Sequence, residues 1–145
     1  MSNRVYFDTS AVAKWYLNEP RSDDVEAYLR NHEPVVVSWL TIVEMRSLLA
    51  RRRREGDFSP EIEWRVFATF QEDIRAGHLL LHHPMDDVPS SATRILGELT
   101  DIPLRTLDAL HLGLALDGGV TSVGTADRVM AVAAPRLGMT ALAFF

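Results

Sequence analysis

Cysteine is absent from this sequence of 145 residues. Disulfide bonds, thiolate nucleophiles and cysteine metal sites are therefore excluded, and any metal ion would have to be bound by Asp, Glu or His. Long hydrophobic runs are also missing, since no stretch approaches the roughly 20 apolar residues of a membrane-spanning helix. The first ten residues, MSNRVYFDTS, lack the apolar region of a signal peptide. We therefore expect a cytoplasmic protein that does not enter a membrane.

Positive charge is scarce and unevenly distributed. The formal net charge is −5, and Lys14 is the only lysine. This balance argues against a domain that holds nucleic acid by its overall charge, but it leaves room for a local basic surface. Four consecutive residues form such a candidate surface: Arg51, Arg52, Arg53 and Arg54. Arginine suits bidentate contact with phosphate or carboxylate, although a solvated helix end favoured by the helix dipole explains the run equally well.

Short apolar runs alternate along the chain with longer helical patterns. A hydrophobic content of 47% is ample for one core in a chain of this length. Alternation of this kind predicts βαβ units and a mostly parallel sheet. We therefore expect a single α/β domain over residues 1–145, with a central sheet flanked by helices as an α/β/α sandwich. The predicted strands are RVYF at 4–7, VVVS at 35–38, HLLLHH at 78–83, VTSVG at 120–124 and TALAF at 140–144.

The helical patterns include two long neighbours separated by a turn containing Gly and Pro, EGDFSPE. This pair predicts a helical hairpin that departs from the regular alternation. The first of the two carries the pattern Thr41-x-x-Glu44, which predicts a capping box at its start. The predicted helices span 10–17, 22–31, 41–54, 60–76, 90–99, 106–116 and 126–133.

Four acidic residues lie where strands end or where helices begin: Asp8, Glu44, Asp108 and Asp127. In a parallel sheet, the ends of the strands and the starts of the helices that follow them share one edge, so these four side chains can converge. Each acid also has a local explanation. Asp8 could cap a helix, Glu44 could complete the capping box, and the other two could complement helix dipoles.

Convergence of carboxylates requires a compensating positive charge. Two unit charges about 4 Å apart repel by roughly 4 kcal/mol at an intermediate dielectric. Carboxylate oxygens are ligands that Mg²⁺ or Mn²⁺ prefers. Such an ion lowers the pKa of a bound water and stabilises charge on a leaving oxygen. The pattern therefore predicts metal-assisted phosphodiester hydrolysis, with all four acids as metal ligands and catalytic residues.

Four segments of the chain, in order, resemble the signature segments of the PIN domain, particularly of VapC-type toxins from bacterial toxin–antitoxin modules. They are FDTSA, TIVEMRSLL, LRTLDALHLGLAL and VTSVGTADRVM. The resemblance implies a ribonuclease in which Asp8, Glu44, Asp108 and Asp127 coordinate Mg²⁺ or Mn²⁺ and activate water for RNA cleavage. It also implies that Ser10 and Thr125 orient carboxylates or waters, although both hydroxyls could instead cap helices.

The resemblance further implies a homodimer and a small VapB-like antitoxin whose C-terminal segment lies across the active site. Residues 51–54 are then candidates for contact with RNA or with the antitoxin. Two other functions compete with this one. A haloacid dehalogenase-like phosphatase would use Asp8 as a nucleophile but needs a second Asp at position 10, where this chain has Ser10. A catalytically silent PIN-fold binding module would retain the fold without the reaction.

Other conspicuous side chains are expected to be structural. His111 lies one turn after Asp108, where packing or a local hydrogen bond is favoured over metal binding. His78 and His82 have the spacing of a helical zinc pair, but the run HLLLHH predicts a strand, which would separate the two side chains. The three tryptophans, Trp15, Trp39 and Trp64, are expected in the core or a dimer interface.

Overall fold

Five parallel strands form the centre of the protein. In this computed structural model, which describes residues 3–145, the strands are hydrogen-bonded in the order β3-β2-β1-β4-β5, and every neighbouring pair is parallel. The predicted parallel α/β architecture is therefore confirmed. The strands are β1 (Val5–Phe7), β2 (Val36–Ser38), β3 (Leu80–His82), β4 (Ser122–Thr125) and β5 (Thr140–Ala143).

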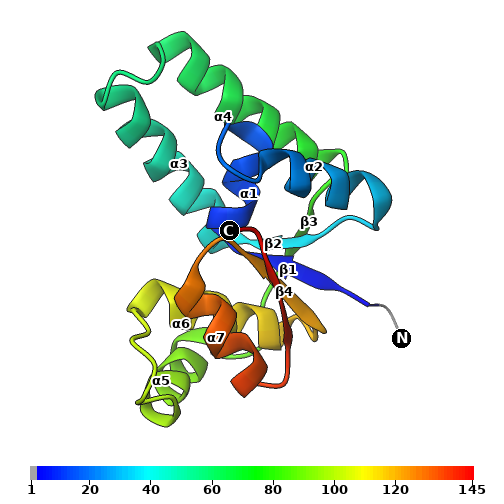
Figure 1. Cartoon of the computed structure of the whole chain (residues 1–145), viewed down its shortest axis with the longest axis vertical. Helices are drawn as coiled ribbons and strands as arrows, with labels where there is room; N and C mark the ends of the chain where they lie inside the picture. The colour runs from blue at the N-terminus through cyan, green and yellow to red at the C-terminus, as the bar shows by residue number, and fades with distance from the viewer. Residues whose placement is uncertain (1–2) are drawn as a thin grey trace.

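Helices cover both faces of this sheet (Figure 1). The first four pack against one face and the last three against the other. Within residues 3–145, none of the helices combines the length and the apolar character that crossing a membrane requires. The helices are α1 (Thr9–Tyr16), α2 (Ser22–Asn31), α3 (Trp39–Arg54), α4 (Pro60–Arg75), α5 (Val88–Glu98), α6 (Thr106–Asp117) and α7 (Arg128–Arg136).

The alternation of side chains along the strands divides the core into two halves. In β1, Phe7 faces the cluster formed with α1 to α4, whereas Tyr6 faces the cluster formed with α5 to α7. Val37 and Val36 divide in the same way in the next strand. Successive strand residues point to opposite faces, so a strand buried on both sides is apolar throughout. Tyr6 is the exception, because its hydroxyl needs a hydrogen-bond partner inside the protein.

The order of the strands creates a topological switch point between β1 and β4. From β1 the chain adds β2 and β3 on one side, and then returns to place β4 and β5 on the other. Open α/β sheets bind ligands in the crevice at the carboxyl ends of the strands on either side of such a point. Asp8 immediately follows β1, and Asp127 lies two residues beyond the end of β4.

Helices α3 and α4 form the predicted hairpin, which extends from one end of the sheet (Figure 1). Glu63 of α4 is buried between two arginines of α3: it accepts a hydrogen bond from Arg53 at 2.6 Å and a short one from Arg46. The Arg46 guanidinium also lies 4.4 Å from the centre of the Trp64 ring. These contacts fasten the two helices together.

The start of α3 corrects one prediction. The helix begins at Trp39 with Ser38 as its N-cap, and the Ser38 amide donates to the Thr41 hydroxyl at 3.1 Å. The predicted capping box between Thr41 and Glu44 is therefore wrong. Strand β2 ends in a serine, which is itself a favoured cap, so the helix starts two residues earlier than predicted. Glu44 consequently lies in the second turn, where it takes no part in capping the helix.

Asp117, the last residue of α6, holds the segment after β3 in place. Its carboxylate accepts hydrogen bonds from His82 Nε2 at 2.6 Å and from the amides of Met85 and Asp86, both at 3.0 Å. Burial acts to raise the pKa of Asp117, but these bonds outweigh it and the pKa lies below its ordinary value. The ionised carboxylate therefore stabilises the folded protein.

We expect Asp117→Asn to lower the free energy of unfolding by about 2 kcal/mol at pH 7, because its amide would face backbone N–H groups. Since the pKa is lower in the folded state, the stabilisation is complete above the unfolded pKa of about 3.9 and is lost as the pH falls below it. Urea unfolding at pH 7 and pH 3.5 would measure both effects. Asp101→Asn, which changes an exposed acid, should have little effect. Equal stability of Asp117→Asn and wild type at pH 7 would contradict the prediction.

Candidate functional site

Asp8 is the most buried of the four predicted acids, with 4% of its surface exposed. Its Oδ1 accepts hydrogen bonds from the Ser10 hydroxyl at 2.6 Å and from the Ala11 amide at 3.1 Å. Its Oδ2 accepts one from the Thr125 hydroxyl at 2.5 Å. Asp8 is thus the N-cap of α1, as the local explanation predicted. Capping accounts only for the bond from the Ala11 amide. The hydroxyls of Ser10 and Thr125 hold the two oxygens of this carboxylate, one each, at the switch point.

Burial has an energetic cost for this carboxylate. It raises the pKa of Asp8, and the charge of His111 together with the hydrogen bonds from Ser10, Thr125 and Ala11 only partly opposes the shift. A buried carboxylate of this kind gains from a nearby positive charge, because the charged form is the one that burial disfavours.

The same two hydroxyls connect Asp8 to Asp127. The Thr125 hydroxyl accepts a hydrogen bond from the Asp127 amide at 2.9 Å, and the Ser10 hydroxyl accepts one from the Ala126 amide at 2.8 Å. Asp127 Oδ1 in turn caps α7 by accepting from two amides of its first turn. Neither Ser10 nor Thr125 is a helix N-cap, since Asp8 and Asp127 hold those positions. Both hydroxyls therefore act on the acids.

Asp108 lies in the first turn of α6, where its Oδ2 accepts a hydrogen bond from the Arg105 amide at 3.0 Å. Burial raises the pKa of Asp108, and the negative charge of Asp127 raises it further, whereas the Arg105 amide and the charge of His111 lower it. The effect of the Asp127 charge on Asp108 places these two carboxylates, from elements distant in sequence, near one another.

Glu44 enters the site from the second turn of α3. Its Oε1 accepts a hydrogen bond from the Thr9 hydroxyl at 2.7 Å and forms a short one with His111 Nε2. Burial acts to raise the pKa of Glu44, but the bonds from His111 and Thr9 and the charge of His111 outweigh it, so the pKa lies below its ordinary value. Glu44 is therefore held as an anion.

Four residues beyond the predicted set belong to this network: Thr9, which donates to Glu44, and then His111, Tyr6 and Ser38. His111 Nδ1 lies 2.6 Å from the Tyr6 hydroxyl, which in turn lies 2.8 Å from the Ser38 hydroxyl. His111 is packed in the core as expected, but its ring bonds to distant residues and not locally, and one of them is a predicted site residue, Glu44. A sequence signal for Tyr6 existed: a tyrosine in an otherwise apolar buried strand must hydrogen-bond its hydroxyl inside the protein. Burial raises the pKa of Tyr6, which keeps that hydroxyl protonated.

The donor set suits a hard divalent cation. Glu44, Asp108 and Asp127 each direct their recorded hydrogen bonds to one oxygen, and no donor within residues 3–145 contacts Glu44 Oε2, Asp108 Oδ1 or Asp127 Oδ2. As the side chains are placed, no group of three or more Asp, Glu or His within residues 3–145 is arranged to hold a metal ion. The acids thus share one edge and keep oxygens for a cation, without sharing one coordination sphere.

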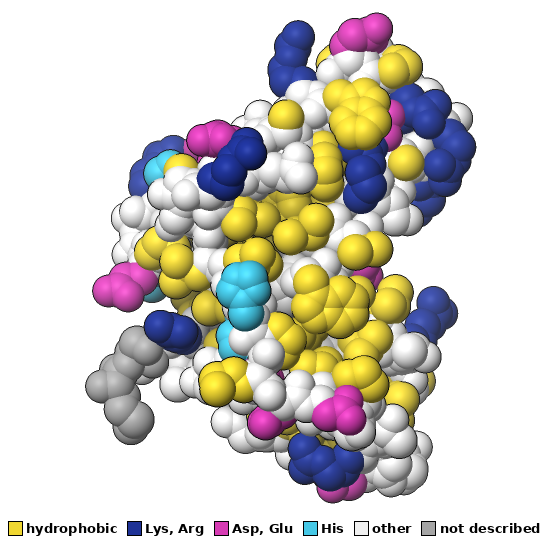
Figure 2. All heavy atoms as spheres, turned by 180° about the vertical axis from the view of Figure 1, so that it is seen from behind, with side chains coloured by type: hydrophobic (Ala, Val, Ile, Leu, Met, Phe, Trp, Pro, Cys, Tyr) yellow, Lys and Arg dark blue, Asp and Glu magenta, His cyan; other side chains and the backbone are white. Residues whose placement is uncertain are grey.

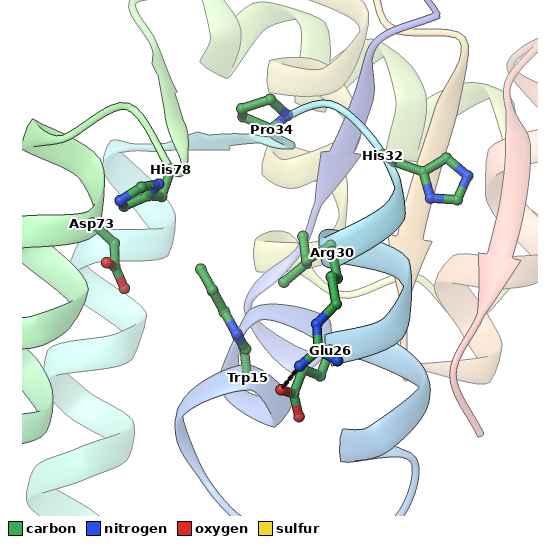
Figure 3. A pocket seen from close by; sticks show the side chains of 8 residues that line it. Trp15, Glu26, Arg30, His32, Pro34, Asp73 and His78 are labelled. Carbon is green, nitrogen blue, oxygen red and sulfur yellow. Dashed lines mark hydrogen bonds and ion pairs between the residues drawn. The ribbon is translucent and has the colours of Figure 1, made fainter.

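A cavity of about 330 Å³ opens beside these residues. Glu44 and Arg51 line it from α3, Thr9 and Ser10 line it from α1, and Leu107 lines it from α6. A second cavity, of about 460 Å³, lies at the opposite edge of the sheet, between α2 and the start of β3 (Figure 3). None of the four acids lines this second cavity. Of the four acids, Glu44 lines the first cavity, which also reaches Arg51.

The structure separates the four arginines that follow one another in sequence. Arg52 pairs with Asp57 and Glu19, and Arg53 pairs with Glu63. Within residues 3–145, neither Arg51 nor Arg54 forms an ion pair. Basic side chains gather at the tip of the hairpin, at the upper right of Figure 2. Only half of the run is thus available to a phosphate or carboxylate partner.

A parallel sheet with a buried carboxylate at its switch point, held by two hydroxyls and accompanied by three further acids, defines a class of α/β protein with an acidic site. The model of the PIN domain matches residues 5–134, and the chain belongs to the PIN-domain family. It is 34% identical over 142 residues to ribonuclease VapC46 of Mycobacterium tuberculosis, and the match covers 96% of each chain.

Two solved structures share the fold. VapC20 of Mycobacterium tuberculosis, described as a sarcin-ricin loop cleaving toxin, has a TM-score of 0.68 at 19% identity, covering 89% of this chain and 94% of that one. DNA-bound VapBC of Salmonella typhimurium has a TM-score of 0.71 at 18% identity, covering 99% of this chain and 100% of that one. The family and fold expected from the sequence are therefore confirmed.

Proposed function

We propose that this protein is a metal-dependent endoribonuclease, the toxin of a toxin–antitoxin module, which hydrolyses RNA phosphodiester bonds at the site of Asp8, Glu44, Asp108 and Asp127. Membership of the PIN family and the relation to ribonuclease VapC46 support the activity. The observation that carries the metal dependence is the buried Asp8 carboxylate at the switch point, with three further acids at the same edge. We also propose that the protein acts in the cytoplasm.

The residues of the chain have separate tasks in this mechanism. Asp8, held by Ser10 and Thr125, and the carboxylates of the other three acids would hold Mg²⁺ or Mn²⁺. The ion would supply an acidified water and a positive charge for the phosphate. Thr9 orients Glu44 by donating a hydrogen bond to its Oε1. Leu107 contributes an apolar side chain to the cavity beside Glu44.

Removal of the metal tests this function directly. We expect purified protein to cut a pool of structured RNAs at discrete positions in Mg²⁺ or Mn²⁺, and we expect EDTA to abolish the products. Products would be read on a sequencing gel, and readdition of Mn²⁺ in excess of EDTA should restore them. Discrete cleavage that persists in EDTA would contradict the metal dependence. Folded protein that binds Mn²⁺ but cuts no RNA would favour the catalytically silent binding module.

The partners in this proposal are RNA, a VapB-like antitoxin and a second copy of the chain. Solved relatives such as VapBC of Salmonella typhimurium are toxin–antitoxin complexes by description. Trp39, Val43 and Trp64 are 42%, 60% and 61% exposed. Of the two places expected for Trp39 and Trp64, the core is therefore excluded and the dimer interface remains. Hydrophobic side chains run down the middle of the face in Figure 2, where a homodimer would cover them. Light scattering on the purified protein would measure its molar mass in solution and so show whether it is a dimer.

Arg51 is the arginine that we expect to contact RNA, because it alone of the four lines the cavity beside Glu44. Arg51→Ala should raise KM for RNA several-fold. It should also reduce the slope of log K against log salt by about 0.7, the value for one lost phosphate contact on a single strand. Arg54→Ala is the matched control, because Arg54 is also exposed but lies outside the cavity. Equal effects of the two variants would show that the charge acts only as part of a diffuse surface.

A further inference from the structure

A continuous chain of hydrogen bonds connects four elements behind the site. It runs from Ser38 at the end of β2 to Tyr6 in β1 at 2.8 Å, and from Tyr6 to His111 of α6 at 2.6 Å. It continues through the short bond from His111 to Glu44 of α3. Ser38 and Tyr6 are fully buried, and His111 is 4% exposed. The chain thus begins in the core and ends at an acid of the site.

The chemistry of the groups fixes the donor at the end of this chain. The Glu44 carboxylate is an anion and only accepts, so the hydrogen in its bond with His111 lies on Nε2. A neutral ring then accepts at Nδ1 from the Tyr6 hydroxyl, and Tyr6 accepts from Ser38. A protonated ring instead donates from Nδ1 to the Tyr6 oxygen, and Tyr6 donates to Ser38. Every hydroxyl and ring nitrogen in the chain has a partner in either arrangement.

The end of the chain determines how Glu44 presents its carboxylate. His111 and Thr9 both bond to Oε1, and no donor within residues 3–145 contacts Oε2. Rotation of the carboxylate would break two hydrogen bonds, one of them to a ring that is itself held by Tyr6. Oε2 is therefore the oxygen that remains for a cation.

We propose that Tyr6 and His111 are positioning residues, which fix the Glu44 carboxylate so that Oε2 binds the divalent cation. This inference rests on the proposed function, because it assumes that the acids bind Mg²⁺ or Mn²⁺. Groups that orient metal ligands in this way typically change metal affinity or activity by about 10- to 100-fold when they are lost. Neither residue touches RNA or the cation in this assignment.

Tyr6→Phe removes one oxygen atom and keeps the ring that fills the core. We expect it to weaken Mn²⁺ binding at least about 10-fold, measured by isothermal titration calorimetry without RNA. In saturating Mn²⁺, kcat should remain below the wild-type value while KM for RNA changes less than twofold.

Tyr16→Phe is the matched control. The Tyr16 hydroxyl donates to Asp73 at 2.6 Å, in the half of the core away from His111. Both variants lose one tyrosine hydroxyl, which makes two hydrogen bonds in Tyr6 and one in Tyr16, and thermal unfolding would measure the loss of stability in each. Mn²⁺ affinity should fall only in Tyr6→Phe.

Two substitutions of His111 test which ring nitrogen matters for Glu44. The amide nitrogen of Gln occupies the place of Nε2, whereas that of Asn occupies the place of Nδ1. His111→Gln can therefore donate to Glu44, and we expect it to bind Mn²⁺ more tightly than His111→Asn. Circular dichroism would verify that both variants are folded before titration.

The outcomes distinguish this inference from the proposed function. Wild-type Mn²⁺ binding with equal affinity in Tyr6→Phe would overturn the positioning role and leave the nuclease proposal standing. A fall in affinity of the same size in Tyr16→Phe would also overturn it, because general loss of stability would then explain both. Wild-type protein that binds no Mn²⁺ would overturn both proposals. Weakened binding in Tyr6→Phe alone supports the inference.

Discussion

Asp8→Asn should reduce the rate of RNA cleavage by about 1,000-fold or more while leaving the protein folded. A metal centre contributes several kcal/mol of transition-state stabilisation, and each 1.36 kcal/mol corresponds to a factor of ten in rate. Asparagine caps helices as well as aspartate does, so α1 keeps its N-cap. Substitution also removes the charge that burial disfavours. Single-turnover cleavage of a labelled RNA and thermal unfolding would measure the two effects separately.

The matched control is Asp87→Asn. Asp87 caps α5 by accepting from the Ser90 amide at 3.3 Å, and it lines no cavity beside the acids. The same chemical change at this cap should leave cleavage at the wild-type rate. Cleavage by Asp8→Asn within a few-fold of wild type would contradict the acidic mechanism, since the most buried carboxylate would then be dispensable.

Gly124→Ala should have the largest effect on stability, about 3 kcal/mol, with a loss of folded yield. Gly124 in β4 lies opposite Phe7 in β1, and a Cβ there would lie 2.3 Å from Cε1 and 2.4 Å from Cδ1 of the Phe7 ring. Phe7 is fully buried, so its ring can move only by displacing the side chains packed around it. Overpacking of a tight core typically costs about 1–3 kcal/mol, and contact with a rigid ring belongs at the upper end. Chemical denaturation monitored by circular dichroism would measure the loss.

Gly97→Ala is the control for this prediction. Gly97 lies within α5, and a Cβ there meets nothing within 4 Å. Alanine is favoured over glycine inside a helix by about 1 kcal/mol, so the control should be neutral or slightly stabilising. Similar stabilities of the two variants would show that the sheet relaxes around Phe7.

The sequence predicted the sheet and most helix positions because alternating apolar runs fix which segments are buried. It also predicted a shared edge for the four acids, since parallel strands place their carboxyl ends together. It did not predict where α3 starts, because Ser38 serves both as the last strand residue and as a helix cap. Two good caps lay three residues apart, and only the position of β2 decided between them.

The periodicity of apolar residues in the sequence did not predict the contacts between distant elements. Arg53 pairs with Glu63, which comes from the opposite arm of the hairpin. His111 meets Tyr6, which lies 105 positions away along the chain. Patterns along one element identify a polar residue as unusual, but its partner depends on how separate elements pack. The site could therefore be predicted as a set of acids and not as a hydrogen-bonded network.

Helix α3 also fixes the distance between Glu44 and Arg51. Glu44 and Arg51 line one cavity from the same helix, seven residues apart, and at 1.5 Å per residue this separation is about 10 Å along the axis. Seven residues make almost two full turns, so both side chains face the same way. Insertion of a single residue between them would turn Arg51 by about 100° and carry it out of the cavity. The segment between Glu44 and Arg51 is therefore tolerant of substitutions and intolerant of insertions or deletions.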